Sequence, residues 1–225
     1  MFPTWRFKNR RDAGQKLALQ LQEYKGKNVV VLAIPRGGVV LGFEVSKALE
    51  APLDIVVPRK IGAPGNPELA IGAVAEDGTV VLDQGLLTMF RISNEYVERE
   101  RAAETAEISR RTRIFRGGHP PLSLAGKLVI IVDDGLATGA TMKAAVASVR
   151  KRGALKIIVA VPVGPPDTVK ELSREVDRVV CPVVFEPFMA IGQFYEDFTQ
   201  VEDDEVIHLL RLAEKWPGGN GPPST

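Results

Sequence analysis

Several features are scarce in this chain of 225 residues, and each scarcity excludes a class of protein. The single cysteine, Cys181, cannot form an intramolecular disulfide, which fits a reducing compartment. Lys and Arg total 29 against 28 Asp and Glu, a net charge of +1, so no overall attraction to nucleic acid or to an anionic membrane follows. The longest apolar run, residues 29–34, is far shorter than the ~20 residues of a membrane helix. Residues 1–11 lack the apolar core of a signal peptide. We therefore expect a soluble, cytoplasmic protein that binds neither nucleic acid nor membrane.

Residues that ligate metals or act as soft nucleophiles are equally sparse. His119 and His208 are the two histidines, and neither has a partner at metal-ligand spacing. Cys181 lies in the apolar run 179–184, where a cysteine more often packs as a small hydrophobe than reacts as a thiol. We therefore expect no protein-held metal site and no catalytic thiol.

What the chain has is an alternation of short apolar runs with segments of helical period. Hydrophobic residues make up 45% and charged residues 25%, which is ordinary for a globular domain with a sizeable core. The alternation is typical of βαβ units. Buried strands are predicted at 29–34, 53–57, 128–132, 156–161 and 176–184. Helices are predicted at 12–25 with Asp12 as the N-cap, 39–49, 141–152, from about 167, and 203–216.

These elements predict an α/β fold with a doubly wound, mostly parallel five-stranded sheet and a small hood region. We expect one domain over residues 1–216, followed by a disordered Gly/Pro/Ser tail at 217–225. In such sheets ligands bind at the carboxyl ends of the strands. The loops after Ile34, Val57 and Val132 emerge at that edge, and they carry the unusual chemistry.

The remaining segments predict elements around the site. Residues 58–68, rich in Gly and Pro, are expected to form a loop, and Asp77-Gly78 suggests a hairpin between strands at 70–75 and 79–82. The charged segment 93–114 predicts a helix, either simply solvated or a mobile cover for an active site. Hood or lid elements are expected at about 86–118 and 185–200, with the 58–68 loop as a further lid candidate.

The loop after the strongest strand combines two carboxylates with a small-residue turn into a helix. Asp133 and Asp134 are suited to accept hydrogen bonds from the hydroxyls of a ribose. The turn offers backbone N–H groups and hydroxyls to a phosphate, through Gly135, Ala137, Thr138, Gly139, Ala140 and Thr141. A Walker A lysine and a G-x-G-x-x-G pattern are absent. An ordinary βα turn would explain one Asp and one Gly, but not this combination, so we predict a site for ribose 5-phosphate.

Residues 129–141, four apolar residues, two acids and a loop ending in Thr-Gly-Ala-Thr, resemble the signature of type I phosphoribosyltransferases. The resemblance in element order covers about residues 12–210. It implies transfer of the phosphoribosyl group of 5-phosphoribosyl-1-pyrophosphate to a nitrogen base, with release of pyrophosphate. Asp133 and Asp134 would then be catalytic, and Mg²⁺ would be bound mostly by substrate oxygens and water. Members of this family commonly form homodimers, so the resemblance also implies a homodimer.

The resemblance also implies where the leaving pyrophosphate binds. The turn Arg36-Gly37-Gly38 would grip it, since two glycines let backbone N–H groups approach an anion closely. The family often has a cis peptide there, and Gly37 would accommodate one. Arg59 and Lys60, after the next strand, would add positive charge; the alternative is a pair of solvated surface cations.

The sequence says least about which base accepts the phosphoribosyl group. Phe188, Tyr195 and Asp197 match loosely the segment in which purine-type enzymes stack and hold the base, although hydrophobic packing explains the segment equally well. Those enzymes carry a lysine in the strand after the phosphate helix, where this chain has Ile157-Ile158-Val159, which argues against a 6-oxopurine. Two other functions stay open: a non-enzymatic regulator that binds phosphoribosyl pyrophosphate, and a phosphoribosyl pyrophosphate synthetase, for which the chain is short.

Overall fold

Five parallel strands form the central sheet of the computed structural model, which describes residues 5–216. The strand order is β2-β1-β6-β7-β9. Their bounds are Val29–Ala33 for β1, Leu53–Ile55 for β2, Leu128–Val132 for β6, Lys156–Ala160 for β7 and Arg178–Val180 for β9. The predicted parallel five-stranded α/β fold is therefore confirmed.

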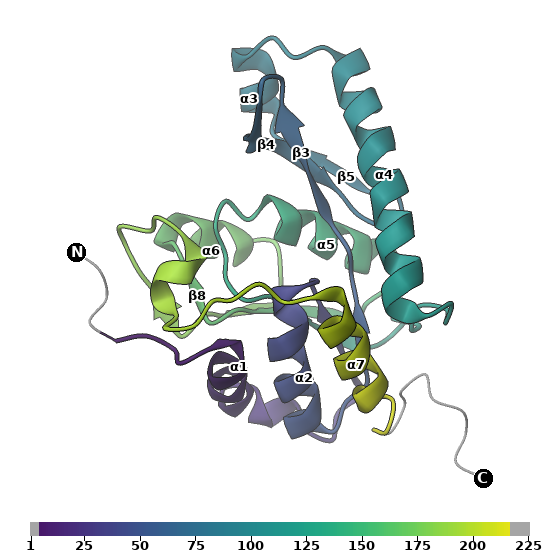
Figure 1. Ribbon diagram of the computed structural model, residues 1–225, viewed down its shortest axis with the longest axis vertical. Coiled ribbons are helices and arrows are strands. Elements are labelled where there is room, and N and C mark those ends of the chain that lie inside the picture. Colours follow the sequence, from purple (N-terminus) through teal and green to yellow (C-terminus); the bar gives the residue numbers. More distant parts are fainter. Residues whose placement is uncertain (1–4, 217–225) are drawn as a thin grey trace.

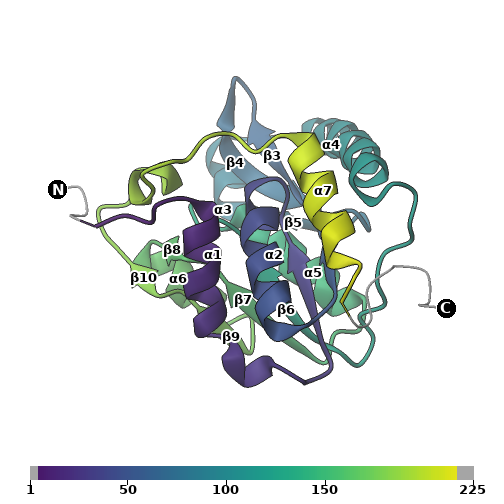
Figure 2. The ribbon, with the colours of Figure 1, turned by 60° about the horizontal axis from the view of Figure 1, so that its bottom comes forward.

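Helices cover both faces of this sheet, which is why its strands are continuously apolar. One face carries α1 (Arg10–Leu19), α2 (Gly37–Leu49) and α7 (Asp203–Ala213), which lie side by side in Figure 2. The other face carries α5 (Ala140–Lys151) and α6 (Pro166–Leu172). Along β6, Ile130 and Val132 pack toward the first layer, whereas Val129 and Ile131 pack toward the second. Strand β6 thus contributes to two hydrophobic cores.

The first helix differs in detail from its prediction. Asn9, rather than Asp12, is the N-cap, because its side-chain oxygen accepts the hydrogen bond from the Asp12 amide at 3.0 Å. The helix ends at Leu19, and a short 3₁₀ turn, η1 (Gln22–Tyr24), completes the predicted segment. The expected apolar face is buried throughout: Ala13, Leu17, Leu21 and Tyr24.

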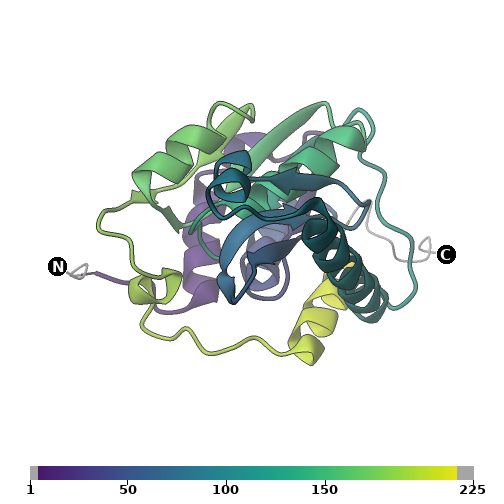
Figure 3. The same ribbon diagram turned by 90° about the horizontal axis from the view of Figure 1, so that it is seen from above.

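Residues 59–116 form a lobe that stands off the central sheet (Figure 1). It contains β3 (Arg59–Ala63), β4 (Asn66–Val74), β5 (Val80–Leu82), α3 (Gln84–Met89) and α4 (Asn94–Arg116). Its three strands form an antiparallel sheet, which confirms the predicted hairpin around Asp77-Gly78, and α4 confirms the predicted charged helix. Seen from above in Figure 3, α4 runs along the edge of the molecule beside α7, which it contacts.

The prediction of a loop at 58–68 was wrong. Strands β3 and β4 pair with each other across a turn in which Gly65 has a φ of +73°. Gly62 lets the strands approach, since a side chain there would lie 2.7 Å from the Pro67 backbone. The glycines and prolines that suggest a loop therefore serve the irregular pairing of a hairpin.

The single strand predicted at 176–184 was also wrong. Pro182 interrupts it, so β9 stays in the central sheet while β10 (Val183–Val184) pairs with β8 (Val163–Gly164) in a separate sheet. Cys181, expected in the core, is half-buried at this break. The last helix ends at Ala213 rather than 216, and the predicted tail at 217–225 lies outside the described residues. Among the residues described, no helix combines the length and apolarity that crossing a membrane requires.

Candidate functional site

The site predicted from the sequence lies where the strand order reverses. From β1 the chain moves to β2 on one side and later returns to β6 on the other side of β1. The loops that follow β1 and β6 therefore emerge next to each other at the carboxyl edge of the sheet, the position where doubly wound sheets bind ligands. A backbone hydrogen bond of 2.9 Å from the Ile34 amide to the Val132 carbonyl joins the two loops at their start.

The two loops pack against each other through Gly37 and Gly38. A Cβ atom on Gly37 would lie 2.0 Å from Oδ2 of Asp134, and one on Gly38 would lie 3.0 Å from Oδ1 of Asp133. Only glycine permits this approach. The structure thus brings the predicted ribose carboxylates and the predicted pyrophosphate turn into contact, although 95 or more residues separate them along the chain. The turn contains a cis peptide at Pro35–Arg36, one bond before the expected position, and Gly37 begins α2.

A third residue at the site, Arg10, was not predicted from the sequence. Its Nε donates to Oδ2 of Asp134 at 2.8 Å, and its Nη1 donates to the Thr199 carbonyl at 2.7 Å. The guanidinium carbon lies 3.8 Å from the centre of the Phe198 ring. Arg10 belongs to a basic N-terminal stretch with no motif of its own, and it contacts a residue 124 positions away, so no local signal could identify it.

The surroundings of Asp133 and Asp134 oppose the presence of a negative charge on both carboxylates at once. Burial, together with the charge of Asp134, raises the pKa of the Asp133 carboxyl well above its ordinary value. Burial also raises the pKa of Asp134, while Arg10 opposes that rise. The Asp133 side chain accepts a hydrogen bond from the Asp134 amide at 2.8 Å. The two adjacent carboxylates therefore share a buried setting with one positive charge, the guanidinium of Arg10.

The predicted phosphate cradle is the amino end of α5. Gly139 is the N-cap, with a φ of +77°, and in the described structure no side chain caps this helix. The first-turn N–H groups of Ala140 and Thr141 therefore have no side-chain cap, and a helix amino end of this kind favours an anion. Two neighbours fix the loop from below: Thr168 donates to the Ala137 carbonyl at 3.0 Å, and Ile191 packs closely on Gly135.

The three predicted cations have other partners in this structure. Arg36 forms long ion pairs of 3.8 Å with Glu202 and 3.6 Å with Asp203, at the start of α7. Arg59 pairs with Glu104 of α4 at 2.6 Å, and Lys60 pairs with Glu68 at 2.8 Å. Arg59 and Lys60 lie in β3 of the lobe, so their assignment to pyrophosphate stays a prediction that requires the lobe to approach the site.

The three predicted acceptor residues differ in their surroundings. Tyr195 is 2% exposed, stacks between Phe7 and Phe198, and donates its hydroxyl hydrogen to the Asp134 carbonyl at 2.6 Å. It therefore supports the loop that contains Asp133 and Asp134. The carboxylate of Asp197 accepts hydrogen bonds from the amide and hydroxyl of Thr199, which lower its pKa. Phe188 packs 5.2 Å from Phe194. A role for these residues in binding the acceptor stays a prediction.

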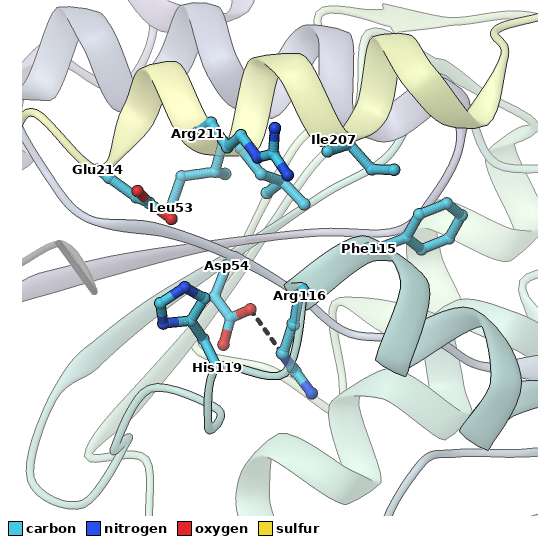
Figure 4. Close-up of a pocket in the computed structure, with 10 residues that line it drawn as sticks. Leu53, Asp54, Phe115, Arg116, His119, Ile207, Arg211 and Glu214 are labelled. Carbon is cyan, nitrogen blue, oxygen red and sulfur yellow. Dashed lines mark hydrogen bonds and ion pairs between the residues drawn. The ribbon is translucent and has the colours of Figure 1, made fainter.

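A separate cavity of about 230 Å³ lies between β2, the end of α4 and α7 (Figure 4). His119 lines it, and at its floor Nε of Arg116 donates to Oδ1 of Asp54 at 2.8 Å. Arg116 also binds Glu76 at 3.1 Å, and Glu76 in turn binds Arg152, which follows α5, at 3.2 Å. This buried network ties the lobe to the sheet and explains why an acidic residue, Asp54, lies inside the buried strand β2.

In the part of the chain that the structure describes, no group of three His, Cys, Asp or Glu side chains is arranged to hold a metal ion.

The fold and the two loops at its switch point define a type I phosphoribosyltransferase fold. Residues 7–199 match the phosphoribosyl transferase domain family, and the chain belongs to that family.

Individual relatives agree with this assignment. MT0597 from Mycobacterium tuberculosis strain CDC 1551 / Oshkosh and Rv0571c from strain ATCC 25618 / H37Rv, both provisionally named phosphoribosyl transferases, are each 45% identical over 209 residues, 93% of this chain. The chain spans about half the length of these curated relatives, 47% in each case. The crystal structure of TT1426 from Thermus thermophilus superposes with a TM-score of 0.78 at 42% identity, covering 91% of this chain and 97% of that one.

Proposed function

We propose that the protein transfers the phosphoribosyl group of 5-phosphoribosyl-1-pyrophosphate to a nitrogen base in a Mg²⁺-dependent reaction. One observation carries the proposal: the Asp133-Asp134 loop, beside the uncapped amino end of α5, lies in contact with the Gly37-Gly38 turn. A ribose with phosphate at one end and pyrophosphate at the other needs these three features together.

In this reaction the bond from ribose C1 to the pyrophosphate oxygen breaks, and its electron pair leaves with pyrophosphate. A bond from C1 to the base nitrogen forms, and the nitrogen's proton passes to solvent. Positive charge develops on the ribose meanwhile, and the carboxylates of Asp133 and Asp134 would stabilise it while accepting the ribose hydroxyls. The backbone of Gly37 and Gly38 would hold the leaving group, with Arg36 turning from its acidic partners to join it.

Magnesium fits the site as a companion of the substrate. Asp134 already gives one oxygen to Arg10, and the described residues offer no cluster of three metal ligands. The pyrophosphate oxygens and water would therefore hold the ion, which supplies charge neutralisation when bound. The protein's own part is to orient the substrate beside these loops.

Water must be excluded, since it would hydrolyse the donor. The lobe of residues 59–116 is suited to cover the site, and its approach would bring Arg59 and Lys60 closer to pyrophosphate. The segment 185–200 would complete the cover from the other side. Limited proteolysis of the lobe should slow when phosphoribosyl pyrophosphate and Mg²⁺ are added; unchanged cleavage would refute the closing motion.

The decisive test is a screen of purine and pyrimidine bases for pyrophosphate release, with and without Mg²⁺. The double variant Asp133→Asn/Asp134→Asn should lose release and weaken donor binding in calorimetry, while Asp204→Asn, an exposed acid on α7, should behave as wild type. Binding of the donor without release by any base would favour the second candidate, a regulator. A homodimer and a cytoplasmic location stay predictions, which sedimentation velocity and fractionation would test.

A further inference from the structure

Arg10 lies against both loops of the proposed site without belonging to either. It is the first residue of α1, and its side chain is 12% exposed. Hydrogen bonds to Asp134 and to the Thr199 carbonyl, and the Phe198 ring against its face, fix the guanidinium in three directions. A side chain held in this way acts as part of the site's framework rather than as a surface charge.

The Arg10–Asp134 pair lies against the turn proposed to bind pyrophosphate. A Cβ atom on Gly37 would meet Nε of Arg10 at 2.7 Å and Oδ2 of Asp134 at 2.0 Å. Gly37 therefore leaves room for the Arg10–Asp134 ion pair, and it also lets the backbone approach the proposed anion. One guanidinium spans the space between the ribose loop and the pyrophosphate turn.

Arg10 also provides the positive charge nearest to the two carboxylates. Asp133 and Asp134 are adjacent, and the third titratable group beside them, Tyr195, donates its hydroxyl hydrogen to the Asp134 backbone. Burial and the neighbouring carboxylates raise the Tyr195 pKa, so it stays neutral. Arg36 is paired with Glu202 and Asp203 instead. Among the described residues, Arg10 is thus the cation that hydrogen-bonds to this carboxylate pair.

We propose that Arg10 is a positioning residue for the ribose carboxylates: it keeps negative charge on the pair and orients Asp134. Oδ2 of Asp134 is bound to Arg10, whereas no other residue of the described chain donates a hydrogen bond to Oδ1. Oδ1 is therefore the oxygen left for a ribose hydroxyl. The inference rests on the proposed function for its ligand, but the charge it assigns to the pair is a property of the free protein.

The test compares Arg10→Gln and Arg10→Lys with Arg11→Gln. Arg11 is the matched control, because its side chain is 63% exposed and pairs with Glu44 at 3.3 Å. Arg10→Gln should raise the KM for phosphoribosyl pyrophosphate about tenfold or more, with a smaller effect on kcat, because a charge-assisted hydrogen bond is lost. Without the cation the carboxyl pKa values rise, so the acid limb of kcat/KM should move to higher pH by about one unit. Arg11→Gln should change neither quantity.

Arg10→Lys separates charge from geometry. Lysine keeps the charge but lacks the planar fork, so the acid limb should return toward that of the wild type while the KM stays raised. If Arg10→Gln lowers the melting temperature yet leaves the KM and the acid limb unchanged, the role is structural and the proposal fails. If Arg10→Gln does not fold, Arg10→Lys decides: a raised KM supports the proposal, and a wild-type KM overturns it.

A measurement on the free protein keeps this proposal distinct from the proposed function. Carbon-13 NMR of labelled aspartate carboxyls follows the titration of the pair without substrate. An upward shift in Arg10→Gln, absent in Arg11→Gln, supports the positioning role even if the wild type releases no pyrophosphate with any base. An unchanged titration overturns it, whatever the enzyme's activity.

Discussion

The buried network around Arg116 predicts a large loss of stability when that residue is replaced. The Arg116 side chain is 6% exposed, Asp54 is 3% exposed and Glu76 is 12% exposed. Arg116→Met keeps the aliphatic volume but leaves both carboxylates without their main counter-charge. Breaking a buried ion pair in this way costs about 3–5 kcal/mol. We expect the lower half of this range, because Asp54 retains hydrogen bonds from the Ile55 and Leu122 amides.

Urea unfolding followed by circular dichroism at 25 °C measures the free energy of unfolding directly. A loss of about 3–4 kcal/mol would also lower the melting temperature by about 6–16 °C in a domain of this size. The control is Arg110→Met on the same helix, where Arg110 is 55% exposed and binds Glu107 at 2.7 Å. An exposed pair of this kind contributes about 0–1 kcal/mol. If Arg116→Met loses no more stability than Arg110→Met, the network does not hold the lobe to the sheet.

Three further predictions concern the site, the thiol and the core. Gly37→Ala should weaken donor binding in calorimetry more than tenfold, because its Cβ would lie 2.0 Å from Asp134 Oδ2; Gly78→Ala, which meets open space, should leave binding intact. Burial raises the pKa of Cys181 to about 12, so a disulfide reagent at pH 8 should label the folded protein much more slowly than the unfolded one; equal rates would contradict this. Ile130→Ala, in the fully buried centre of β6, should cost about 2–5 kcal/mol in urea unfolding, and a loss below that range would show that the core adapts to the cavity.

The central sheet and the position of the loop that contains Asp133 and Asp134 could be predicted because their signals are local. Strands buried on both faces need five or so consecutive apolar residues, and residues 128–132 show this pattern directly. The adjacency of the Gly37-Gly38 turn and the Asp133-Asp134 loop followed from strand topology, since both end strands of one parallel sheet.

The β3–β4 hairpin and the role of Arg10 depend on tertiary contacts, which is why sequence patterns did not predict them. Gly62, Gly65 and Pro67 are residues typical of a loop, and they form a hairpin here because β3 pairs with β4. Arg10 acquires its role from Asp134, Phe198 and Thr199, all more than 120 residues away. A long-range ion pair of this kind has no period, spacing or motif by which to recognise it.

The pairing of Arg10 with Thr199 across the site has a consequence for the lifetime of the protein. The proposed binding surface is assembled from segments that span positions 10–199, so a partly folded chain has no complete site and the donor binds the native state alone. By mass action, a ligand at 100 times its Kd then adds about 2.7 kcal/mol to the stability of the whole fold. Under the proposed function, the cellular supply of phosphoribosyl pyrophosphate would regulate abundance as well as turnover, since copies without bound donor unfold more often and are degraded sooner.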